Sequence, residues 1–164
     1  MLLYIFIIIA LALILFFLSI LFTSTGRLPI IRDEHGNTFE NSISEKAFIP
    51  VGGSSQGVFI RGEDMSKPVL LFLHGGPGTP ELATSTSFES KYRLENSFVV
   101  CYWDQRGTGM SYSKDIPLST MNLDQLIDDT YEVSEYLKKR FTCNKIYLMG
   151  HSWGTYLGLK TVEK

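Results

Sequence analysis

Three apolar runs constrain the fold of this chain most, because each one ends abruptly at a glycine-rich stretch. The runs are Pro68–Leu73, Phe98–Trp103 and Lys145–Met149. Continuous apolar runs of this length are typical of strands that are buried on both faces, as in parallel sheets. Ligands of open α/β sheets bind at the carboxyl ends of the strands. We therefore expect the three glycine-rich stretches to converge on one edge of a sheet.

Helical periodicity appears between the second and third runs, over Leu123–Arg140. Five apolar residues recur there at helical spacing: Leu123, Leu126, Ile127, Val133 and Leu137. Asn122 followed by Gln125 resembles a capping box at the start of this helix. A further helix is expected to begin at Ser152. Strands that alternate with helices predict an α/β fold with a mostly parallel sheet.

A hairpin is predicted ahead of the first apolar run. Lys46–Val51 and Gly57–Arg61 are short strand candidates, and the glycines and serines of residues 52–55 suggest the turn between them. Residues 23–45 are polar and contain glycine and proline, which is typical of a linker. The expected organisation is an amino-terminal segment over residues 1–22, a linker over 23–45 and one domain over 46–164.

The first 22 residues are almost wholly apolar. A helix of this length can cross a hydrocarbon core of about 30 Å. No lysine or arginine precedes the run, unlike a secretory signal peptide. We therefore expect an uncleaved transmembrane helix and a single-pass membrane protein. Arg27 and Arg32 follow the run, so the positive-inside rule favours a domain that faces the cytoplasm, and a domain outside the cell stays open.

Charge and cysteine content exclude several classes of function. The net charge of −2 creates no basic field, so a nucleic-acid partner is not expected. Cys101 and Cys143 form no ligand cluster with histidines, which argues against a structural zinc site. Two buried free thiols are the favoured interpretation, and no cofactor is implied.

The first glycine-rich stretch has the sequence His74-Gly75-Gly76-Pro77-Gly78. Its glycines allow a sharp turn that presents backbone N–H groups to a ligand. Such groups can stabilise a developing oxyanion. A tight turn without a catalytic role is the alternative.

The second stretch runs from Asp104 to Gly109. One interpretation of Asp104 is that it is a catalytic carboxylate. The favoured interpretation is structural: Asp104, Arg106 and the glycines fix a buried loop beside the site.

The third stretch, Gly150-His151-Ser152-Trp153-Gly154, has the form of a nucleophile elbow. In such an elbow, a sharp turn between a strand and a helix exposes the serine oxygen, and the N–H of the next residue donates to the oxyanion. A nucleophilic serine also needs a histidine base and a carboxylate that orients it.

Together the three stretches resemble the prolyl iminopeptidase branch of the α/β-hydrolases. That family has HGGPG after its third strand, DQRG after its fourth and a Gly-x-Ser-Trp-Gly elbow after its fifth. The resemblance covers residues 44–164 and implies an incomplete α/β-hydrolase fold that ends shortly after the elbow. It implies that Ser152 is the nucleophile and that Gly76 and Trp153 supply the oxyanion N–H groups. The residues that shape the site would be His74, Gly75, Pro77, Gly78, Asp104 and Arg106.

The resemblance implies a serine hydrolase that acts as an aminopeptidase on small peptides in the intact protein. The family's catalytic aspartate and histidine lie beyond Lys164, so this chain alone is expected to be inactive. None of His35, His74 and His151 is expected to replace the missing base. The family often has glycine at the position of His151, so hydrolysis of esters, lactones or small amides is one alternative. A non-catalytic, membrane-anchored half-domain that pairs with a second polypeptide is another.

Overall fold

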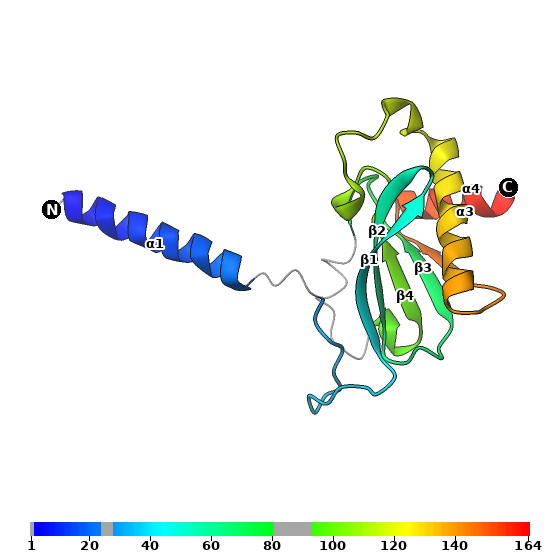
Figure 1. Cartoon of the computed structure of the whole chain (residues 1–164), viewed down its shortest axis with the longest axis horizontal. Coiled ribbons are helices and arrows are strands. Elements are labelled where there is room, and N and C mark those ends of the chain that lie inside the picture. Colours follow the sequence, from blue (N-terminus) through cyan, green and yellow to red (C-terminus); the bar gives the residue numbers. More distant parts are fainter. Residues whose placement is uncertain (1, 24–27, 81–92) are drawn as a thin grey trace.

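The computed structural model describes residues 2–23, 28–80 and 93–164, and its centre is a five-stranded sheet (Figure 1). The strand order is β1-β2-β4-β3-β5. The pairs β1–β2 and β2–β4 are antiparallel, whereas β3 pairs in parallel with both β4 and β5. The strands span Ile43–Val51 (β1), Ser54–Gly62 (β2), Val69–Leu73 (β3), Val99–Trp103 (β4) and Tyr147–Gly150 (β5).

The sheet is therefore mixed, and the prediction of a mostly parallel sheet is wrong. The difference arises because the predicted hairpin joins the same sheet, where β2 pairs antiparallel with β4. Within the hairpin, β1 and β2 are joined by the two residues Gly52 and Gly53 alone. A two-residue connection can join only antiparallel strands. Both glycines have positive φ angles, +53° and +73°, as the tight turns that match strand twist require. Strand β1 also begins at Ile43, ahead of the predicted strand Lys46–Val51.

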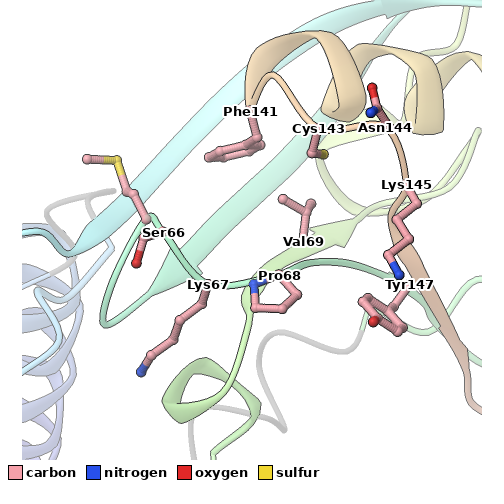
Figure 2. A pocket seen from close by; sticks show the side chains of 10 residues that line it. Ser66, Lys67, Pro68, Val69, Phe141, Cys143, Asn144, Lys145 and Tyr147 are labelled. Atoms are coloured by element: carbon pink, nitrogen blue, oxygen red, sulfur yellow. The ribbon is translucent and has the colours of Figure 1, made fainter.

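A hollow of about 550 Å³ lies at the end of the sheet where β3 and β5 begin (Figure 2). Val69 and Tyr147, the first residues of these strands, line it together with Phe141 and Cys143. Cys143 is half-buried there, whereas Cys101 is buried in the central strand β4. The expectation of two buried thiols therefore applies fully only to Cys101.

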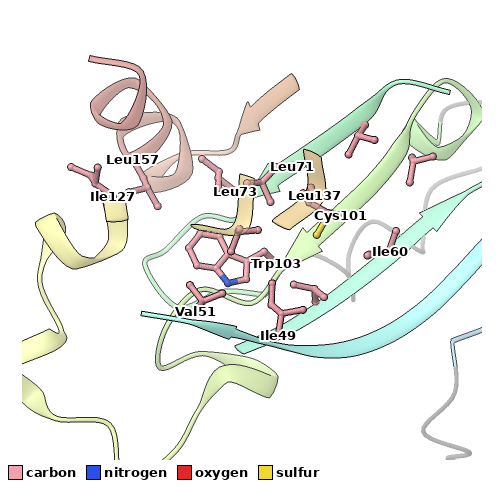
Figure 3. Packing of buried hydrophobic residues seen from close by; sticks show 14 residues of the cluster. Ile49, Val51, Ile60, Leu71, Leu73, Cys101, Trp103, Ile127, Leu137 and Leu157 are labelled. Atoms are coloured by element: carbon pink, nitrogen blue, oxygen red, sulfur yellow. The ribbon is translucent and has the colours of Figure 1, made fainter. Parts of the chain in front are cut away.

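Helices α3 (Leu123–Arg140) and α4 (Trp153–Glu163) cover one face of the sheet. The bounds of α3 are those that periodicity predicted, and the Asn122 side chain accepts the Gln125 N–H at 2.9 Å. Figure 3 shows side chains of α3 and α4 directed at alternate residues of β3 and β4. This core includes Leu71, Leu73, Cys101, Trp103, Ile127, Leu137 and Leu157.

The opposite face of β3 and β4 is buried as well. Leu70, Phe72, Val100 and Tyr102 form a second cluster, against which Leu94 and Phe98 pack. Every residue of β3 and β4 is buried, which explains why their sequences are continuously apolar. Strand β5 differs, because it lies at the edge of the sheet and exposes Tyr147 and Met149.

The amino-terminal apolar segment forms helix α1, Leu2–Thr23, whose side chains are described for Tyr4 and for residues 6–18. Crossing a hydrocarbon core takes about 20 consecutive apolar residues in one helix. Within the described residues, no helix has the length and apolar character needed to span a membrane. This finding contradicts the predicted transmembrane helix, and with it the predicted single-pass localisation and orientation.

A buried ion pair ties α3 to the hairpin and to the loop after β4. The Arg106 guanidinium donates from Nε and Nη2 to the two carboxylate oxygens of Asp129, at 2.7 and 2.8 Å. Nη2 also donates to the Gly52 carbonyl oxygen at 2.9 Å. Gln56 and Gln125 donate to the remaining acceptor positions of the carboxylate, both at 2.9 Å. The pair is thus fully hydrogen-bonded, as buried charges require.

We expect Arg106→Met to lower the free energy of unfolding by about 3–5 kcal/mol, because it leaves the Asp129 carboxylate buried without its counter-charge. Lys160→Met is the matched control: it removes the cation of the exposed Lys160–Glu163 pair and should leave the free energy of unfolding nearly unchanged. Urea unfolding measures both. Equal small losses would contradict the importance of the buried pair.

Candidate active site

Three strands end at one level of the sheet and bring the glycine-rich stretches together. Leu73, the last residue of β3, lies opposite Trp103 of β4 and opposite Gly150 of β5. Residues 74–78, 104–109 and 151–154 follow directly after these three strand ends. The expected convergence on the carboxyl edge of the sheet is therefore present.

Ser152 stands at the sharp turn between β5 and α4. Its φ angle is +52°, in the left-handed region that residues other than glycine rarely adopt. The residue is exposed. Strain of this kind is common where a side chain must be presented for function. Trp153 is the first residue of α4, so its N–H has no carbonyl partner inside the helix.

The two outer glycines of the elbow are required by close backbone approach. A Cβ on Gly154 would lie 1.9 Å from the Leu73 carbonyl oxygen, and a Cβ on Gly150 would lie 2.5 Å from the carbonyl carbon of Gly154. The His151 N–H also donates to the Leu73 oxygen at 3.0 Å. The spacing Gly-x-Ser-x-Gly is therefore what allows α4 to start directly against the end of β3.

The turn over residues 74–78 packs against this elbow. Gly76 and Gly78 have φ angles of +112° and +96°, which favour glycine. A Cβ on Gly75 would lie 3.1 Å from Nδ1 of His151 and 3.4 Å from Cβ of Ser152. Backbone of the turn thus lies directly beside the candidate nucleophile, and the His151 ring lies against Gly75.

His74 is buried, and both of its ring nitrogens have partners. The Gln105 backbone N–H donates to Nε2 at 3.1 Å, so Nε2 must be an acceptor. Nδ1 then carries the proton and donates to the Gly75 carbonyl oxygen at 2.9 Å. These bonds hold a neutral imidazole inside the turn, and the site-shaping role of His74 stays a prediction.

Asp104 and Arg106 do not pair with each other. The Asp104 carboxylate accepts the Met110 N–H at 2.7 Å, and its backbone carbonyl oxygen accepts the Ser111 hydroxyl. Burial raises the pKa of the Asp104 carboxyl above its ordinary value of 3.8, and the bond from Met110 opposes part of this rise. Asp104 thus holds the loop that carries Gly107 and Gly109, while Arg106 holds α3.

Sequence reasoning missed two residues of this region, Gln105 and Asp129. Gln105 bonds both to the turn and to the elbow, and Asp129 is the partner of Arg106. The available signal for Gln105 was its place in the motif Asp104-Gln105-Arg106-Gly107, because every other residue of that motif had been assigned a role.

A cavity of about 380 Å³ lies beside these residues. It is lined by Pro77, Gly78, Gln105 and Trp153, among others, and by Leu123 and Leu126 of α3. Its size is within the range of small-molecule sites. The larger hollow of Figure 2 lies where β3 and β5 begin, at the opposite ends of these strands from Ser152. The smaller cavity is therefore the one that fits the chemistry. No group of three or more potential metal ligands occurs among the described residues.

Comparisons with known proteins match the same part of the chain. Residues 66–164 match the family described as serine aminopeptidase, S33. The probable aminopeptidase YbaC of Bacillus subtilis (strain 168) is 41% identical over 125 residues, which cover 76% of this chain and 39% of that protein. The proline iminopeptidase of Clostridioides difficile (strain 630) is 32% identical over 111 residues, covering 66% and 35%.

Solved structures of other proteins superpose on a similar share of the chain. A proline iminopeptidase-related protein of Thermus thermophilus superposes with a TM-score of 0.60 at 26% identity, covering 74% of this chain and 41% of that one. Epoxide hydrolase A of Mycobacterium thermoresistibile shares the fold, with a TM-score of 0.55 at 21% identity. The superposition covers 73% of this chain and 34% of the epoxide hydrolase chain. The chain spans about two fifths of the length of the first relatives, 39% and 41%.

We expect Gly154→Ala to destabilise the protein by about 3 kcal/mol or more, because the new methyl group meets the rigid Leu73 backbone. Gly158→Ala, one turn later in α4, is the control. Its Cβ would meet only the Cδ1 end of the Leu73 side chain, at 3.3 Å, and alanine favours the helix, so a change within about 1 kcal/mol is expected. Denaturant unfolding compares them, and equal effects would refute the close-approach explanation.

The raised pKa of Asp104 predicts a pH dependence. The folded carboxyl holds its proton more tightly than the unfolded one, so its contribution to stability is greatest below pH 3.8 and falls as the pH rises through the folded pKa. In Asp104→Asn this loss is absent. The variant should therefore gain stability relative to the parent protein as the pH rises from 3.8.

Urea unfolding across a pH series measures this difference. Asp64→Asn is a control of opposite sign, because hydrogen bonds from Ser66 lower the pKa of the Asp64 carboxyl. That variant should lose stability relative to the parent as the pH rises through the lowered folded pKa toward 3.8 and just beyond. The same trend in both variants would contradict the assignment for Asp104.

Proposed function

The chain belongs to the serine aminopeptidase family S33, and we propose that it carries the nucleophile of an aminopeptidase that acts on small peptides. Ser152 is that nucleophile. The observation that supports this proposal most directly is its exposed position at a φ angle of +52°, between a strand and the first turn of α4. The backbone of residues 74–78 lies beside it and supports an oxyanion site.

The proposed reaction is acyl transfer. The Ser152 oxygen attacks the carbonyl carbon of the first peptide bond while its proton passes to a histidine base. The N–H groups of Gly76 and Trp153 stabilise the oxyanion. The proton then passes to the leaving amine, and water hydrolyses the acyl-enzyme by the same route. No cofactor takes part, because side chains and backbone dipoles supply every step.

We propose that the histidine base and its carboxylate come from sequence outside these 164 residues. Within the described residues, His35 lies in the polar lead-in, His74 is committed to the turn, and the ring of His151 lies against Gly75. The 164-residue chain alone should therefore show negligible turnover. The cavity between Trp153 and α3 is the candidate location for part of the substrate.

Ser152→Ala in the complete protein should lower kcat/KM by about 10⁴-fold or more, because loss of a nucleophile disables the triad as a unit. Ser119→Ala, at an exposed serine of the loop before α3, is the control and should leave the rate unchanged. Substrates are the p-nitroanilides of proline and alanine, with and without a blocked amino terminus, and p-nitrophenyl acetate. Full activity of the Ser152 variant would refute the assignment of Ser152 as the nucleophile.

The same substrates separate the two hydrolase functions. A requirement for a free amino terminus supports the aminopeptidase. Rapid ester hydrolysis without that requirement would replace it with an esterase on the same nucleophile.

A further inference from the structure

We propose that Gln105 is a positioning residue, whose side chain links the nucleophile elbow to the turn over residues 74–78. This inference rests on the proposed function, because it concerns the relative placement of the Gly76 and Trp153 N–H groups. Through the link, one buried amide sets the separation of the two donors that an oxyanion would need.

Three hydrogen bonds of Gln105 cross between loops. Its Oε1 accepts the indole Nε1–H of Trp153 at 3.1 Å, and its Nε2 donates to the His74 carbonyl oxygen at 3.0 Å. Its backbone N–H donates to the His74 ring. The side chain is bonded on one side to the residue that follows Ser152 and on the other to the residue that precedes Gly75-Gly76.

Chemistry fixes the orientation of the amide. The indole N–H is only a donor and the carbonyl oxygen is only an acceptor, so a flipped amide would place like groups together at both ends. Gln105 is 2% exposed, so water does not replace a lost partner freely. Glutamine is therefore the side chain that satisfies both loops at once.

The link acts in addition to the sheet. The elbow is already tied to β3 through strand pairing and through the His151 N–H on the Leu73 carbonyl oxygen. Loss of the Gln105 side chain should therefore leave the sheet intact and loosen only the contact between the Trp153 ring and the turn. A local effect of this kind is distinguishable from a general loss of stability.

The chain contains its own matched control. It has two tryptophans, and each indole N–H donates to a buried glutamine: Trp153 to Gln105, and Trp103 to Gln56 at 2.8 Å. Gln56 lies in β2 and is 0% exposed, and its amide also bonds to Asp129. Gln56→Met thus removes an equally buried indole acceptor that belongs to the Arg106–Asp129 network.

The test is NMR on the ¹⁵N-labelled 164-residue chain, with Gln105→Met and Gln56→Met compared. Gln105→Met should shift the Trp153 indole resonance and leave that of Trp103 in place. It should also speed hydrogen exchange of the Thr79 and Gly154 amides, which donate to the Gly75 and His151 carbonyl oxygens, by about tenfold relative to α3 amides. Gln56→Met should shift the Trp103 indole and show no such preference. An unchanged exchange ratio in Gln105→Met, or the same ratio in both variants, would overturn the proposal.

Trp153→Phe gives a second test that leaves Gln105 and the turn untouched. It removes the indole donor and leaves a smaller aromatic ring, and it should still speed exchange of the Thr79 amide relative to α3 amides. This variant decides the question if Gln105→Met does not fold, and unchanged exchange at Thr79 would then overturn the link. None of these measurements requires turnover. Full activity of Ser152→Ala together with a positive exchange result would refute the proposed function and leave the link standing.

Discussion

The buried Arg106–Asp129 ion pair is the interaction on which the rest of this domain depends. It joins the loop after β4 to α3, and through the Gly52 carbonyl oxygen it also holds the hairpin turn. A desolvated charge tolerates little misplacement, so the pair fixes the path of the loop. Gln105 precedes Arg106 in that loop, and its bonds to His74 and Trp153 begin from a backbone that the pair has already placed.

Close backbone approach is the second constraint, and it acts at the end of β3. The Leu73 carbonyl oxygen accepts the His151 N–H, and it would clash with any side chain at position 154. The start of α4 is thus pressed against the strand. Ser152 is left at the turn between strand and helix, exposed and with a φ angle that an ordinary turn would avoid.

Local patterns predicted the elements well, because each depends on neighbours in sequence. Continuous apolar runs located β3 and β4, and periodicity with the Asn122 cap located α3. The partners of Gln105 and Arg106 were missed because they lie 48 and 23 positions away, in Trp153 and Asp129. A single sequence carries no pairing signal over such distances. The transmembrane prediction rested on composition alone and was contradicted. The sheet is mixed because the hairpin joins it through the antiparallel pairing of β2 with β4, which links segments about 40 positions apart.

Strand order explains why the candidate site is where it is. Because β3 lies between β4 and β5, the turn that follows it must emerge between the loop of residues 104–109 and the elbow. An amide in the first of these loops can then reach the other two, which is what Gln105 does. If β4 lay between β3 and β5 instead, the turn and the elbow would be two strand spacings, about 10 Å, apart. The pairing of β3 with β5 is therefore a condition for any site that uses N–H groups from both the turn and the elbow.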